Sequence, residues 1–155
     1  MKLVERRVFI DAIPSSVYPL LTEADLLLEW MAPIATVDTR VGGVITWTHH
    51  NGDTVVGEFL ELIENRRIVF TFGWSRADVG VPPGSTVVEI DLVPKRGGTE
   101  LRLVHRGLEG PMADAHGEGW SNYLQRLARR AEGRNPGPDP LENQRVPSRR
   151  DLRLD

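Results

Sequence analysis

Apolar and polar residues alternate in short runs between residues 34 and 107, and this period of two predicts a series of β-strands. Turn sequences separate the runs, and the clearest are VGG (41–43), HNGD (50–53), ENRR (64–67) and KRGG (95–98). One side of the strands gathers apolar, aromatic and histidine side chains, at Ile45, Trp47, His49, Ile68, Phe70, Phe72, Trp74, Val88, Ile90, Leu92, Leu101, Leu103 and His105. We therefore expect a curved antiparallel sheet with one buried face and one polar face.

The run from 54 to 63 leaves the orientation of its side chains open. Two sets of residues compete for the buried face, Val56, Leu60 and Leu62 against Val55, Phe59 and Ile63. Depending on which set is buried, Glu58 is either a solvated side chain or a buried carboxyl group with a raised pKa, suited to act as a general base.

Two short helices are predicted between the first strand and residue 34. PSSVYPLLT (14–22) has the composition of a short helix that Pro19 limits in length. Thr22 and Asp25 resemble a capping box at the start of a second helix in LLLEWM (26–31).

A long amphipathic helix is predicted near the end of the chain, from about residue 112 to residue 131. Its inward positions recur at steps of three and four, at His116, Trp120, Tyr123 or Leu124, Leu127 and Ala131. Gly117 shares a face with Trp120, so it is expected to turn toward the sheet, where a missing side chain allows close approach or leaves space. Gly119 points further round the helix.

Residues 133–155 form a proline- and arginine-rich tail with little periodicity. The expected organisation is therefore one domain over residues 1–132 followed by this tail. The tail docks either on its own domain or on a second subunit, and the pattern does not decide between them.

The composition is that of a soluble protein with a single domain. The chain has 155 residues, no cysteine and a net charge of −3. The charge argues against a nucleic-acid partner, because phosphate contacts need a basic surface. No window is apolar enough to span a membrane, and the N-terminus lacks the apolar core of a signal peptide, so a cytoplasmic location is expected.

No cofactor or metal ion is predicted. His49 and His50 are adjacent on a strand and therefore point to opposite faces. No histidine pair has the helical spacing of a metal site, and no cysteine can complete one. The chain also lacks a Walker-type phosphate loop and a G-x-S-x-G nucleophile elbow.

The predicted elements give an α+β fold, in which about six or seven antiparallel strands wrap around the long C-terminal helix. In five segments the chain resembles the START-like (SRPBCC, helix-grip) superfamily, and in particular the family of activator of Hsp90 ATPase homologues. These segments are DAIPSSVYPLLTEADLLLEWM, DTRVGGVITW, GEFLELIENRRIVFTFGW, GGTELRLVHRGL and AHGEGWSNYLQRL. The resemblance covers roughly residues 3–131 and leaves the tail outside.

The resemblance implies a cavity between the C-terminal helix and the sheet that takes a hydrophobic or amphipathic small molecule. The residues expected to line it are Trp30, Trp47, Phe70, Phe72, Trp74, His105, His116, Gly117 and Trp120. The aromatic residues among them either line a gap or simply fill the core. Each histidine either fixes a polar end of the ligand or satisfies a structural hydrogen bond.

Three functions remain open on the sequence. The leading hypothesis is a non-catalytic or weakly catalytic domain that binds a small apolar or amphipathic molecule. The second is a cyclase- or hydrolase-like enzyme that uses His105 with Glu58 or His116. The third is a protein-interaction domain of the co-chaperone kind, for which an exposed apolar patch or a tail clasping another chain would be evidence. A homodimer is compatible with each of them.

Overall fold

The computed structural model describes residues 1–155 and contains one sheet, three α-helices and one 3₁₀ turn. The strands are β1 (Lys2–Ile10), β2 (Ile34–Val37), β3 (Val44–Thr48), β4 (Thr54–Ile63), β5 (Arg67–Trp74), β6 (Thr86–Lys95) and β7 (Gly98–Leu108). The helical elements are α1 (Pro14–Thr22), α2 (Ala24–Leu27), η1 (Ala77–Val79) and α3 (Gly110–Ala131). No helix among them is long and apolar enough to cross a membrane.

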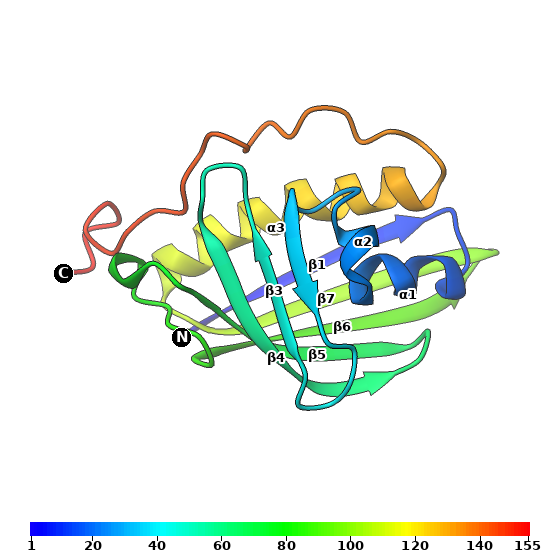
Figure 1. Cartoon of the computed structure of the whole chain (residues 1–155), viewed down its shortest axis with the longest axis horizontal. Helices are drawn as coiled ribbons and strands as arrows, with labels where there is room; N and C mark the ends of the chain where they lie inside the picture. Colours follow the sequence, from blue (N-terminus) through cyan, green and yellow to red (C-terminus); the bar gives the residue numbers. More distant parts are fainter.

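The seven strands form a single antiparallel sheet in the order β1-β7-β6-β5-β4-β3-β2. Figure 1 shows this sheet bending around α3, with α1 and α2 near the C-terminal half of that helix. The amphipathic face of α3 supplies its buried residues to the same core as the inward faces of the strands. The predicted α+β architecture, including the two short helices after the first strand, is confirmed.

The structure settles the orientation of β4. Val55 and Phe59 are fully buried, whereas Glu58 is exposed on the outer face, so the reading of Glu58 as a buried base is wrong. An irregularity in register between Phe59 and Glu61 shifts the pattern beyond this point, which explains the two competing sets in the sequence. Gly57 is needed here, because a Cβ atom would collide with the carbonyl oxygen of Thr71.

The first short helix spans the predicted residues 14–22, whereas the second lies at Ala24–Leu27 rather than at 26–31, and its predicted capping box is wrong. The Thr22 hydroxyl donates to the Tyr18 carbonyl (3.0 Å), and α2 begins after Glu23 without a side-chain cap, so Thr22 and Asp25 form no capping box. Pro19 lies inside α1, and the helix still continues to residue 22. Buried leucines follow the proline, and their packing offsets the backbone hydrogen bond that proline cannot donate.

Residues 133–155, here called the C-terminal segment, dock on their own domain. Figure 1 shows the segment leaving the end of α3 and running back along the helix, past the β3–β4 hairpin, to the vicinity of η1. The segment contains turns but no helix or strand. Its apolar residues Leu141, Val146, Leu152 and Leu154 pack against the main core.

Candidate functional site

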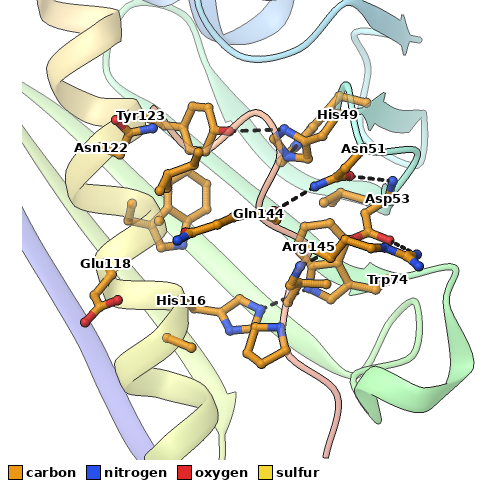
Figure 2. A pocket seen from close by; sticks show the side chains of 18 of the residues that line it. His49, Asn51, Asp53, Trp74, His116, Glu118, Asn122, Tyr123, Gln144 and Arg145 are labelled. Carbon is orange, nitrogen blue, oxygen red and sulfur yellow. Dashed lines mark hydrogen bonds and ion pairs between the residues drawn. The ribbon is translucent and has the colours of Figure 1, made fainter. Parts of the chain in front are cut away.

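A cavity of about 440 Å³ lies between α3, the β3–β5 part of the sheet and the C-terminal segment (Figure 2). Aromatic and imidazole side chains make up much of its wall: Trp47, His49, Phe72, Trp74, His116, Trp120 and Tyr123. The C-terminal segment contributes Leu141, Gln144, Arg145, Val146, Pro147 and Leu152. The cavity therefore has three walls, and the third belongs to a part of the chain that the sequence patterns left unassigned.

Five of the nine residues proposed from the sequence line this cavity, and four do not. The five are Trp47, Phe72, Trp74, His116 and Trp120. The four that lie elsewhere are Trp30, Phe70, His105 and Gly117. Residues that sequence reasoning left out of the lining include His49, Asn51, Asp53, Gly119 and Tyr123.

Trp30 and Phe70 fill the core instead of facing the cavity. The Trp30 indole is 2% exposed and donates to the Leu20 carbonyl at 2.8 Å, so it joins α1 to the loop after α2. Phe70 packs edge-on between Trp47 and Phe59, with ring centroids 6.1 and 6.4 Å away. The alternation of β5 correctly places Phe70 inward, but it cannot show where along the strand the core ends and the cavity begins.

The two glycines of the C-terminal helix have different surroundings. A Cβ atom at Gly117 would meet the guanidinium group of Arg6, so this glycine makes room for a side chain of β1. One helical turn further along α3, the Ser121 hydroxyl accepts a hydrogen bond from the Arg6 Nε–H at 2.8 Å. Gly119 is the glycine that lines the cavity, and a Cβ atom there would meet nothing within 4 Å.

Three histidines near the cavity each accept a hydrogen bond from a tryptophan. The pairs are Trp47–His49 (3.1 Å), Trp74–His116 (3.0 Å) and Trp120–His105 (3.1 Å). An indole N–H can only donate, so the accepting imidazole nitrogen carries no proton and the other ring nitrogen is the donor. The three hydrogen bonds thus fix the tautomer of all three rings.

The second nitrogen of each ring is also engaged. His105 Nε2 lies 2.9 Å from the Thr86 hydroxyl, which itself donates to the Phe72 carbonyl at 2.6 Å. His116 Nδ1 faces the Met112 carbonyl at 2.7 Å. His49 Nδ1 faces the Tyr123 hydroxyl at 3.3 Å. Each imidazole therefore has a protein partner at both nitrogens, which is the structural alternative considered for His105 and His116.

Burial keeps the two deepest histidines neutral. Burial, with a smaller contribution from the neighbouring His116, lowers the pKa of His105 to about 3. Burial lowers the pKa of His116 to about 4, against the opposing effect of its hydrogen bond to the backbone of Met112. Both rings are uncharged at neutral pH, and they cannot serve as imidazolium acids there.

The pairs of residues considered for catalysis are not brought together. The rings of His105 and His116 lie 5.6 Å apart between centroids, but each bonds to other groups. Glu58 is exposed on the opposite face of the sheet. The geometry therefore gives no support to an acid–base mechanism built on His105.

A cluster of polar side chains around Asp139 joins α3 to the C-terminal segment at one end of the cavity. Asp139 accepts hydrogen bonds from the Tyr123 hydroxyl (2.6 Å) and from the Asn122 amide (3.1 Å). Burial alone would raise the pKa of Asp139, but these bonds and the nearby Arg126 outweigh it, so the pKa is lowered. Burial, together with Asp139, raises the pKa of Tyr123. Tyr123 is therefore a neutral donor rather than a phenolate.

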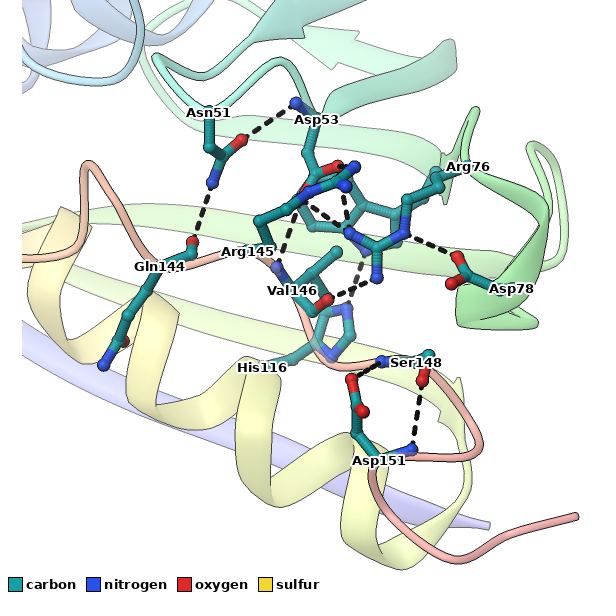
Figure 3. Close-up of polar contacts among 11 residues, drawn as sticks. Asn51, Asp53, Arg76, Asp78, His116, Gln144, Arg145, Val146, Ser148 and Asp151 are labelled. Carbon is teal, nitrogen blue, oxygen red and sulfur yellow. Dashed lines mark hydrogen bonds and ion pairs between the residues drawn. The ribbon is translucent and has the colours of Figure 1, made fainter.

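Asp53 is the most deeply buried carboxylate at the cavity, and Figure 3 shows what surrounds it. Its side chain is 1% exposed and accepts hydrogen bonds from Arg76 (3.0 and 3.1 Å), Arg145 (2.6 Å) and the backbone N–H of Val146 (3.2 Å). Burial alone would raise its pKa, but these bonds and charges lower it. The sequence marked HNGD only as a turn, since nothing local shows that two distant arginines reach its aspartate.

The model of the family described as "Activator of Hsp90 ATPase homolog 1-like protein" matches residues 11–132. The human activator of 90 kDa heat shock protein ATPase homolog 1 is 27% identical over 122 residues. That match covers 79% of this chain and 34% of the human protein, so the chain spans about a third of the length of this relative.

Solved structures extend the comparison. An AHSA1-like protein from Rhizobium etli is 38% identical, with 94% of this chain and 91% of that chain covered and a TM-score of 0.69. A protein from Chromobacterium violaceum is 25% identical over 84% of this chain and 96% of its own, with a TM-score of 0.71. The Aha1 dimer from Colwellia psychrerythraea is 21% identical, covers 85% of this chain and 97% of its own, and has a TM-score of 0.73, a likeness of fold alone. The Rhizobium etli match is too long to end at residue 132 and therefore includes part of the C-terminal segment.

Proposed function

The chain belongs to the family of activator of Hsp90 ATPase homolog 1-like proteins, and from this starting point we propose that it binds a small amphipathic molecule, a ring system with one polar end, in the cavity beside α3. The observation that carries the proposal is the cavity itself, an aromatic-walled space of about 440 Å³ where core packing would otherwise leave none. Its volume lies within the range of about 300–1,000 Å³ that is usual for small-molecule sites.

The wall of the cavity favours a flat apolar body. Trp47, Phe72, Trp74 and Trp120 present ring surfaces whose N–H groups, where they have them, are already bonded to histidines. A ligand placed against these rings gains by the removal of apolar surface from water, at about 25 cal/mol per Å², and by ring stacking. A polar group at the buried end of the ligand would have to break one of the existing bonds, which costs about 1–3 kcal/mol.

The polar end of the ligand is assigned to the exposed rim. Gln144, Arg145 and Glu118 are the exposed polar residues of the lining, whereas His116 and Trp120 are buried. Figure 2 shows the Gln144 side chain reaching from the C-terminal segment toward α3. Because the rim carries one carboxylate and one guanidinium already paired with Asp53, a neutral hydrogen-bonding group suits it best.

The proposal is tested with N-phenyl-1-naphthylamine, a neutral aromatic probe with a single N–H that fluoresces in apolar surroundings. We expect the protein to bind it in a saturable manner, with one probe per chain. Gly119→Leu places a side chain into the cavity opening and should weaken binding at least about tenfold, the equivalent of ~1.4 kcal/mol. Gln125→Leu adds leucine to the exposed face of the same helix and serves as the control.

Equal binding by the Gly119→Leu and Gln125→Leu variants would refute the assignment of the site, and the absence of saturable binding by the unaltered protein would refute the function. Native mass spectrometry of freshly purified protein provides an independent observation, because a ligand retained from the cell appears as an added mass.

The remaining hypotheses have less support. The enzyme hypothesis needs free acid–base groups, and both nitrogens of each paired histidine are engaged. The interaction hypothesis anticipated a tail that clasps another chain, but the C-terminal segment packs on its own domain. A homodimer stays a prediction, consistent with the dimer of the Colwellia psychrerythraea Aha1.

A further inference from the structure

We infer that the C-terminal segment is a lid over the cavity and that Asp53 is the latch that holds it closed. Opening of the lid would speed the entry and exit of a ligand, and this consequence rests on the proposed function. The opening of the lid itself does not. Six of the 21 residues that line the cavity belong to this segment. Displacement of the segment would turn a three-walled cavity into a groove between α3 and the sheet.

Asp53 joins the body of the protein to the segment. Of its three donors, Arg76 belongs to the body, while Arg145 and the Val146 N–H belong to the segment. Arg76 also donates to the Val146 carbonyl at 2.5 Å. The backbone of Val146 is thus held on both sides, at its N–H by Asp53 and at its carbonyl by Arg76, as Figure 3 shows.

The charges explain why Asp53 controls this contact. Arg76 and Arg145 both direct guanidinium groups at the same carboxylate, so they lie close to each other. Asp53 provides the negative charge between them. If that charge is removed, two like charges remain beside a side chain that is itself 1% exposed, and they repel. The Arg145 side is the one that can move, because it lies on a segment without helix or strand.

The other attachments of the segment are at its ends. Asp139 binds Tyr123 and Asn122 near the beginning, and Arg149 donates to Glu109 at 2.5 Å near the end. Between them the segment crosses the cavity opening, with Asn51 donating to the Gln144 carbonyl at 2.7 Å. Leu141 and Val146 pack against the core here, and side-chain hydrogen bonds rather than a helix or strand hold the rest of the stretch. Such regions open at a lower free-energy cost than core elements do.

The inference is tested with Asp53→Asn, which keeps the shape of the side chain and removes its charge. Hydrogen–deuterium exchange should show the Val146 amide exchanging about tenfold faster in this variant, with α3 amides unchanged, since tenfold corresponds to ~1.4 kcal/mol of lost closure. Asp91→Asn is the matched control, because Asp91 receives two hydrogen bonds from Arg67 on the outer face of the sheet. Arg145→Gln, at an exposed residue, weakens the latch without touching the body of the fold.

The second readout is the dissociation rate of bound N-phenyl-1-naphthylamine, measured by stopped-flow fluorescence. We expect it to rise about tenfold in Asp53→Asn, to rise less in Arg145→Gln and to stay unchanged in Asp91→Asn. Equal exchange at Val146 in the Asp53→Asn and Asp91→Asn variants would overturn the latch. If the unaltered protein does not bind the probe, the proposed function fails, while the exchange data still decide the lid, because they need no ligand.

Discussion

Moderate acidification should destabilise this protein through its two buried histidines. Native His105 and His116 have pKa values of about 3 and about 4, whereas in the unfolded chain both return to the ordinary value of 6.5. Above pH 6.5 both states hold neutral rings and the histidines add no pH dependence. Below pH 6.5 the unfolded chain binds protons on these two histidines and the native state does not, so stability falls as the pH falls. The fall ends when the native rings also become protonated, near pH 4 and below.

The size of the effect follows from this difference. Each pH unit below 6.5 costs about 1.4 kcal/mol for each proton bound only by the unfolded chain, so each histidine removes about 2 kcal/mol between pH 7.5 and 5. The two together therefore remove about 4 kcal/mol, a large share of the 5–15 kcal/mol that is usual for a domain. Burial also lowers the pKa of His49, which adds to the loss. The carboxyl groups of Asp53 and Asp139 titrate below this range, because their ordinary pKa is 3.8 and both native values are lower.

Urea unfolding at pH 7.5 and at pH 5, at one ionic strength, measures the loss directly. His116→Gln removes one titrating ring, so the loss in that variant should be about 2 kcal/mol smaller than in the unaltered protein, whatever the stability of the variant at pH 7.5. The comparison of two differences cancels the cost of the substitution itself. An equal loss in both proteins would refute the conclusion that His116 is buried in its neutral form.

Three further substitutions test the contacts described above. Trp74→Phe removes the only donor to His116 Nε2. We expect the free energy of unfolding, measured with urea, to fall by about 1–3 kcal/mol. We also expect NMR titration to show a higher pKa of His116, since a buried acceptor without a donor favours protonation. Gly117→Ala should raise the free energy of unfolding by up to about 1 kcal/mol, because the new Cβ atom meets only the flexible end of the Arg6 side chain. Gly57→Ala should lower the free energy of unfolding by about 1–3 kcal/mol, because the new Cβ atom collides with the backbone of Thr71. Thermal melts of the two glycine variants give the comparison, and a shift in the same direction in both would contradict it.

The fold was readable from the sequence because most of its information is local. A period of two with turn signals defines β3, β5, β6 and β7, and a three- and four-residue period defines α3. The failures also have local causes. The register irregularity in β4 switches the pattern within one strand, and the capping box at Thr22 is replaced by a bond from the same hydroxyl to Tyr18. Competing local hydrogen bonds of this kind are not distinguishable by residue type.

The site was only half readable, because its decisive contacts are distant in sequence. Asp53 meets Arg145 and Val146 more than ninety residues away. The composition of the C-terminal segment is that of a disordered tail, yet its leucines and valine reach the core and its polar groups bond to the rim. Periodicity indicates a face only where there is a regular element, and this segment has none.

The tryptophan–histidine pairs show why residue type alone left the role of the histidines open. His49, His105 and His116 lie on apolar faces, and a histidine placed there is expected equally for a ligand anchor and for a structural acceptor. What decides between these roles is the number of buried donors in reach. The indole N–H groups of Trp47, Trp74 and Trp120 would be unsatisfied without an acceptor, and each finds one imidazole nitrogen. Each pair is then mutually required, so loss of either member leaves a buried polar group unpaired. The histidines shape the cavity by fixing the orientation of its indole walls. Under the proposed function, the groups left to recognise the polar end of the ligand are those at the rim.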